Sequence, residues 1–155
     1  MKNKDILKLL QGLNQISNYP GTKFAYCVAK NMNIIKPELE SLNKAVEQTK
    51  EFKEYENKRI ELAIKYAKKD SKGDPTIANN EYVLEDKKGF DKQIKELQKG
   101  YDKAIKEREK QFEEYNKLLE EDVDIKLYQI ELDNLPKEIT PQQMSAILSI
   151  VKEVK

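Results

Sequence analysis

Two charged stretches decide the fold: Glu38–Lys69, ELESLNKAVEQTKEFKEYENKRIELAIKYAKK, and Lys88–Glu121, KGFDKQIKELQKGYDKAIKEREKQFEEYNKLLEE. Both carry apolar side chains at alternating steps of three and four residues, which is the spacing of one helix face. The segment between them, Asp70–Asp86, is rich in turn-forming residues. We therefore expect a mostly α protein built on a long antiparallel helical hairpin, coiled-coil-like, with residues 70–87 as its tip.

The apolar seam of the second stretch is close to a heptad repeat. It comprises Ile94, Leu97, Tyr101, Ala104, Arg108, Phe112, Tyr115 and Leu118. Gly100 lies within this stretch and costs a helix about 1 kcal/mol relative to alanine, so one interpretation is that it marks a tight helix crossing. Two arms alone bury only a narrow stripe, which predicts a homo-oligomer.

The remaining segments predict a small helical base for the hairpin. Residues 1–36 read as N-terminal helices, with Asn3 as the first N-cap, and residues 122–155 as a β segment followed by a C-terminal helix that Thr140 caps. Residues 37–121 form the hairpin, and Pro37 either kinks a continuous helix or opens a new one. We expect a single domain over residues 1–155.

Two short β elements are also expected. At the tip, Thr76–Ala78 and Tyr82–Leu84 flank a pair of asparagines and predict a β-hairpin. Near residues 123–132, apolar and polar side chains alternate with the period of a strand, and a bulge near Leu127 would account for a slip in that alternation.

Composition argues against several classes of function. Charged residues make up 37% of the chain, yet 29 Lys and Arg against 28 Asp and Glu leave a net charge of +1 with the two signs interleaved, so nucleic-acid binding is unlikely on this composition. No apolar run approaches the ~20 residues of a membrane span, and no signal-peptide pattern is present. We expect no membrane association and a location inside the cell.

Enzyme chemistry is not expected. The chain has no histidine and one cysteine, Cys27, and it carries none of the common phosphate-binding or nucleophile motifs. Asp122 with Asp124, or Glu120 with Glu121, could form an acidic pair, but a solvated helix end explains them better. We predict no catalytic residues, no cofactor and no metal, with Cys27 as a small core residue.

The tip is the predicted partner-binding surface. Five lysines lie in the sequence around one tyrosine there, and the full set is Lys68, Lys69, Lys72, Tyr82, Lys87 and Lys88. A phosphate-bearing partner could bind such a cluster, although a solvated loop is the alternative. Tyr19, Tyr26 and Tyr128 also lie near expected chain reversals or edges, where an exposed ring could anchor a protein or stack on a base.

Three segments near the ends of the chain are distinctive: Thr22–Asn31 (TKFAYCVAKN), Val123–Leu135 and Ile139–Ile147 (ITPQQMSAI). A charged helix, a KDSKGDP turn and a second charged helix lie between the first and the second of them. In these features the chain resembles a family of small phage and prophage proteins of unknown function, from phages of Gram-positive and gut bacteria. Pro37, the position of Tyr128 and the length of the second arm depart from the family pattern. The resemblance implies phage origin and supplies no catalytic residues.

These observations lead to a non-enzymatic, phage-encoded binding protein as the functional hypothesis. It would sequester or block a host protein or a small nucleotide-like ligand, such as a component or signal of antiviral defence, in the cytoplasm of the infected bacterium. The alternatives are a virion-associated structural or assembly protein of the head or tail, and a holdase that resembles prefoldin in joining coiled-coil arms to short strands.

Overall fold

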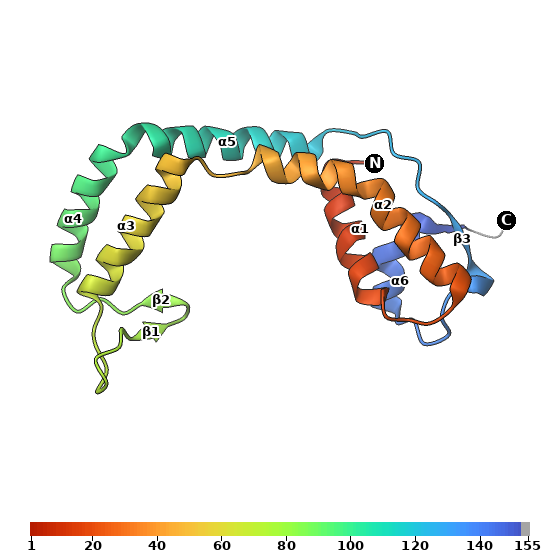
Figure 1. Cartoon of the computed structure of the whole chain (residues 1–155), viewed down its shortest axis with the longest axis horizontal. Helices are drawn as coiled ribbons and strands as arrows, with labels where there is room; N and C mark the ends of the chain where they lie inside the picture. The colour runs from red at the N-terminus through yellow and green to blue at the C-terminus, as the bar shows by residue number, and fades with distance from the viewer. Residues whose placement is uncertain (153–155) are drawn as a thin grey trace. The chain divides into compact units, whose positions relative to one another are not determined.

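The computed structural model describes residues 1–152 and is 66% helical, with six α-helices and two sheets of two strands each in that part of the chain (Figure 1). The expectation of a mostly α protein is confirmed. Contacts divide the chain into two compact units. Unit 1 consists of Met1–Val46 and Glu113–Lys155, and unit 2 consists of Glu47–Phe112.

Unit 1 contains the hydrophobic core. Helix α1 (Asn3–Ile16) packs against both α2 (Thr22–Ala45) and α6 (Pro141–Ile147), and the last residues of α5 (Asp102–Glu120) also belong to this unit. Helix α2 runs through Pro37 without ending there. The buried apolar side chains form one cluster: Ile6, Leu9, Leu13, Ile16, Phe24, Cys27, Val28, Ile35, Ile130, Ile147, Ile150 and Val151.

A glycine sets how closely α1 approaches α6. A Cβ added to Gly12 would lie 2.8 Å from the Ala146 Cβ and 2.9 Å from the Ala146 carbonyl oxygen. Real Cβ atoms do not approach backbone so closely, so only glycine allows this contact. The sequence suggested a tight helix crossing at Gly100, but a Cβ added there would meet nothing within 4 Å. The tight crossing lies at Gly12 instead.

The first turn of α1 is docked onto the end of α5, within unit 1. Asn3 begins the helix rather than capping it, and its side-chain amide donates a hydrogen bond of 2.8 Å to the Leu118 carbonyl. The Lys2 amide bonds the Asp5 carboxylate at 3.1 Å, which satisfies a free N–H of the first turn. The expected N-cap role of Asn3 is therefore wrong: its side chain satisfies another helix's terminal carbonyl.

The segment expected as a strand over residues 123–132 is extended but mostly unpaired with other strands. Only β3 (Ile130–Glu131) is a strand, and it pairs in parallel with β4 (Val151–Lys152). Further upstream a buried side chain replaces the neighbouring strand: Asn31 accepts a 2.9 Å hydrogen bond from the Tyr128 amide and donates one of 2.9 Å to the Tyr128 carbonyl. Burial alternates as far as Leu127, and the slip lies at Tyr128 and Gln129, which are both exposed.

The expected start of the C-terminal helix is confirmed. Thr140 accepts a hydrogen bond from the Gln143 amide, and the Gln143 side chain accepts one from the Thr140 amide, which completes a capping box with Pro141 at the first helical position. Two 3₁₀ turns flank this region, Leu132–Asn134 before α6 and Leu148–Ile150 after it.

Unit 2 is built from shorter helices than the sequence predicts. Helix α3 (Lys50–Tyr66) packs against α4 (Lys87–Gly100), and the first part of α5 follows after Tyr101. The first predicted arm is interrupted, because α2 ends at Ala45 and Thr49 caps α3 by accepting a hydrogen bond from the Phe52 amide. Thr49, which lies inside the first predicted arm, is an N-cap, and each arm is two helices rather than one.

Aromatic and cationic side chains line the helix contacts of unit 2. The Tyr55 ring lies 5.8 Å from the Tyr101 ring, and the Arg108 guanidinium lies 4.2 Å from the Phe112 ring centroid and 5.6 Å from that of Phe52. Such contacts stabilise without deep burial. Of the described residues in this unit, Tyr55, Ala67 and Ala104 are the buried apolar ones.

The predicted β-hairpin at the tip is confirmed. Strands β1 (Ile77–Ala78) and β2 (Glu81–Tyr82) pair antiparallel, and Asn79 and Asn80 between them have φ angles of 51° and 63° (Figure 1). Asparagine tolerates these left-handed angles, which a two-residue hairpin turn requires.

Candidate functional site

The five tip lysines predicted as a binding surface are exposed, and none of them forms an ion pair within residues 1–152. They are Lys68, Lys69, Lys72, Lys87 and Lys88. Acidic side chains lie between them along the chain, namely Asp70, Asp74, Glu81, Glu85 and Asp86. Asp70 is committed to the turn itself, since its carboxylate accepts hydrogen bonds from the Lys72 and Asp74 amides. The tip is therefore a mixed-charge surface, and its binding role stays a prediction.

Tyr82 is half-buried and does not share a hollow with these lysines. It lines a hollow of about 530 Å³ between the β-hairpin and α3, together with Arg59, Ile60 and Leu84, and none of the five lysines lines that hollow. Arg59 is already engaged by the Glu56 carboxylate at 3.0 Å, which raises the pKa of its guanidinium. The lysines and the tyrosine are thus neighbours in sequence that do not form one pocket.

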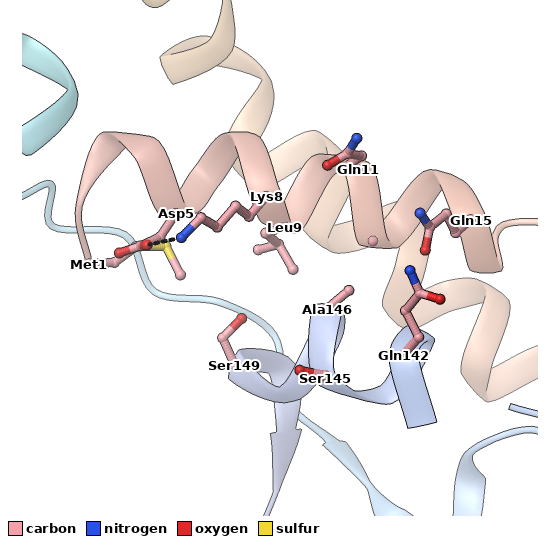
Figure 2. Close-up of a pocket in the computed structure, with 11 residues that line it drawn as sticks. Met1, Asp5, Lys8, Leu9, Gln11, Gln15, Gln142, Ser145, Ala146 and Ser149 are labelled. Carbon is pink, nitrogen blue, oxygen red and sulfur yellow. Dashed lines mark ion pairs between the residues drawn. The ribbon is translucent and has the colours of Figure 1, made fainter. Parts of the chain in front are cut away.

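Unit 1 carries a larger groove that the sequence did not indicate. It lies between α1 and α6, has a volume of about 680 Å³, and is shown in Figure 2. Its floor is made of small or apolar residues, Leu9, Gly12 and Ala146, where the two helices approach most closely. The volume lies in the range of ordinary ligand sites.

Amide and hydroxyl side chains form the rims of this groove. Gln11 and Gln15 lie on the α1 side, while Gln142, Ser145 and Ser149 lie on the α6 side. Figure 2 shows the Gln15 and Gln142 side chains pointing toward one another. Within the described residues none of these five side-chain groups makes a hydrogen bond, so their donors and acceptors are open to a ligand.

Charge is nearly absent from the groove. The charged side chains that line it are Asp5 and Lys8, which lie 3.9 Å apart as an exposed ion pair. Neutral donors and acceptors around a floor of small residues suit a neutral, hydrogen-bonding ligand such as a peptide backbone, because no net charge selects for an ion.

One sequence signal could have found this groove. In a chain with 37% charged residues, the α6 sequence PQQMSAI carries none, although several of its residues are exposed. An exposed helix face without charge is unusual in such a protein. The sequence does not show which helix lies opposite this face of α6, because the contact between Gly12 and Ala146 cannot be inferred from it.

Two side chains that could take part in catalysis, Cys27 and Glu120, are respectively buried in the core and hydrogen-bonded to lysines. Cys27 is fully buried, as predicted for a core residue, and burial raises the pKa of its thiol. Glu120 accepts hydrogen bonds from Lys2 and Lys4, which lower the pKa of its carboxyl to about 2. Among residues 1–152 no group of three histidine, cysteine or acidic side chains is arranged to hold a metal ion.

Comparison of the chain with protein-family models, with curated proteins and with solved structures found no match. None of the helices described within residues 1–152 combines the length and apolar character needed to cross a membrane.

Proposed function

We propose that this protein is a non-enzymatic, phage-encoded binding protein that sequesters or blocks a host molecule, and that the groove between α1 and α6 is its binding surface. The observation that carries the proposal is the set of five amide and hydroxyl side chains on the groove rims whose hydrogen-bonding capacity is unused within the described chain. Groups of this kind confer specificity when a ligand satisfies them.

The shape of the groove favours an extended peptide segment of a host protein over a compact small molecule. Donors and acceptors recur along both rims: Gln11 and Gln15 lie one turn apart on α1, and Ser145 of α6 is followed by Ser149 in the 3₁₀ turn after it. A peptide backbone presents N–H and C=O groups at regular intervals and can meet both rows. Such binding needs no catalytic group, which agrees with the absence of histidine from the chain.

Self-association through unit 2 is the second part of the proposal. Ile60 and Ile64 lie one turn apart on α3 and are 41% and 39% exposed, and Ile77 and Phe112 are exposed as well. A second copy that covered α3 and α4 would complete a coiled-coil-like bundle and bury Ile60 and Ile64. The half-exposed apolar side chains support this arrangement, in which the tip lysines remain available to a partner.

The test is native mass spectrometry of protein purified from its bacterial host, before and after mild denaturation. We expect a defined oligomer that carries a host polypeptide, released on denaturation. A double variant, Gln15→Ala with Gln142→Ala, should lose the added mass and keep the oligomer. The matched control replaces two exposed amides of α2 that do not line the groove and do not belong to α3 or α4, Asn33→Ala with Asn43→Ala, and should keep both.

Two results would overturn the proposal. Equal recovery of the host polypeptide with the groove variant and with wild type would remove the groove as the binding surface. Recovery of the protein in purified phage particles, with no host polypeptide bound in the cytoplasm, would favour the virion-associated alternative.

A further inference from the structure

Unit 1 carries a second hollow, which shares no lining residue with the α1–α6 groove. It has a volume of about 710 Å³ and is lined by the first turns of α2 and by the chain around β3 and β4. Two exposed tyrosine rings dominate it: Tyr26 on α2 is 57% exposed and Tyr128 before β3 is 43% exposed. Exposed rings of this size usually find cover in a ligand or partner.

The two rings are held in a fixed mutual geometry. Their centroids lie 5.5 Å apart and their planes meet at 83°, an edge-to-face contact. The backbone of Tyr128 is also fixed, because Asn31, which is fully buried, binds both its amide and its carbonyl. A ring that is already ordered loses little conformational entropy when a ligand stacks on it, which favours binding.

Lysines add positive charge beside these rings. Lys23 lies three residues before Tyr26 on α2, lines the same hollow and forms no ion pair within residues 1–152. Lys152 also lines the hollow, but its ammonium group lies 3.7 Å from the Glu131 carboxylate, which offsets its positive charge. The hollow thus combines ring faces with one uncompensated ammonium group, and Gln129 and Asn134 add neutral hydrogen-bonding groups to its lining.

We propose that this hollow binds a nucleoside monophosphate, with the base stacked on the Tyr26–Tyr128 pair and the phosphate beside Lys23. Stacking on tyrosine accepts any base, because every base has a π-face, while the ammonium group selects for the phosphate. The site is distinct from the α1–α6 groove and does not depend on it, so the protein has two ligand-binding surfaces in one unit.

The test is isothermal titration calorimetry of the full chain with AMP, adenosine and inorganic phosphate, each up to about 1 mM. AMP should bind, and adenosine and inorganic phosphate should each bind more weakly than AMP by about threefold or more, because each retains only one of the two contacts. No detectable binding of AMP would overturn the proposal. Equal binding of adenosine and AMP would overturn the assignment of an anionic ligand.

Variants locate the site. Tyr26→Leu should weaken AMP binding by about tenfold, whereas Tyr26→Phe, which keeps the ring, should bind within about twofold of wild type. Lys23→Gln should weaken binding of AMP but not of adenosine, and its control Lys30→Gln, an exposed lysine on the same helix, should change neither. Wild-type affinity for AMP in Tyr26→Leu and in Tyr128→Leu would overturn the placement.

The groove variant separates this proposal from the proposed function. Gln15→Ala with Gln142→Ala should bind AMP as wild type does, because neither side chain lines the tyrosine hollow. Loss of AMP binding in that variant, with its fold intact by circular dichroism, would contradict the independence of the two sites and assign the nucleotide to the α1–α6 groove.

Discussion

Unit 1 and unit 2 bury side chains of the same residue type to different extents. Isoleucine is fully buried at Ile6, Ile16 and Ile35 in unit 1, whereas Ile60 and Ile64 of unit 2 remain about two-fifths exposed. Unit 1 closes three helices and an extended segment around one core, while α3 and α4 of unit 2 pack with an edge-to-face contact between the Tyr66 and Phe90 rings. The comparison teaches that helical periodicity predicts which face is apolar but not how fully that face is covered.

The largest expected effect follows directly from this difference. Ile35→Ala removes a fully buried side chain from α2 and should lower the free energy of unfolding by about 2–5 kcal/mol. Ile60→Ala makes the same change on α3, where the single chain leaves the side chain 41% exposed, and should cost less than about 1 kcal/mol at protein concentrations low enough to keep the chain monomeric. Urea denaturation followed by circular dichroism measures both. At high protein concentration the cost of Ile60→Ala should rise, and a cost that stayed below about 1 kcal/mol there would contradict the proposed cover of α3 by a second copy.

Two of the helical glycines, Gly12 and Gly100, should respond to alanine with opposite signs. Gly12→Ala places a Cβ against the backbone of Ala146, and the overpacking of about 1–3 kcal/mol exceeds the gain of about 1 kcal/mol in helix propensity. Gly100→Ala meets nothing within 4 Å and should stabilise the protein by up to about 1 kcal/mol. Thermal unfolding of the two variants beside wild type gives the signs, and stabilisation by Gly12→Ala would contradict the close contact between α1 and α6.

Asparagine offers a third comparison. Asn31→Ala leaves the Tyr128 amide without its partner and the Tyr128 carbonyl with only the Cys27 thiol as donor, and should cost about 1–3 kcal/mol. Asn57→Ala replaces an exposed asparagine on α3 and should change stability by no more than about 0.5 kcal/mol. Hydrogen exchange adds a second readout, because the Tyr128 amide should lose protection in Asn31→Ala alone. Unchanged protection there would show that the segment is held by other contacts.

Local chemistry made much of the fold predictable from the sequence. Thr140 with Gln143, and Asn79 with Asn80, specify a helix start and a hairpin turn through bonds and angles within a few residues, and both predictions are confirmed. The interruption at Thr49 was missed because threonine at a seam position also fits a helix interior. Only the hydrogen bond from the Phe52 amide identifies its capping role.

The features that define the candidate sites depend on contacts between distant residues. Asn31 looks like an ordinary helix residue until Tyr128, 97 positions away, comes beside it. Likewise, the groove exists because Gly12 admits Ala146, and nothing near Gly12 in the sequence indicates that partner. The binding role of the tip stays a prediction, but its residues do not share one pocket: the lysines flank Tyr82 in sequence, whereas the Tyr82 side chain lines a hollow that none of them lines.

The smallest expected effects concern exposed carboxylates, one in each unit. Hydrogen bonds from Lys2 and Lys4 lower the pKa of Glu120 from its ordinary value of 4.5 to about 2, and bonds from Lys58 and Tyr101 lower the pKa of Glu54. A carboxyl whose pKa is lower in the folded state stabilises it above the unfolded-state pKa, and that contribution is lost as the pH falls.

For Glu120 the loss should therefore run from about pH 4.5 down to about pH 2. Urea unfolding of wild type, Glu120→Gln and Glu54→Gln between pH 7 and pH 2 should show each variant's stability difference from wild type as constant near neutrality and shrinking below pH 4.5. High salt should reduce both differences, since both carboxylates are exposed. If the Glu120→Gln difference persisted to pH 2, the lysine contacts of Glu120 would not exist in solution, and the start of the chain would be held at the end of α5 by the hydrogen bonds of Asn3 and by the contacts of Met1 with Asp122 and Val123.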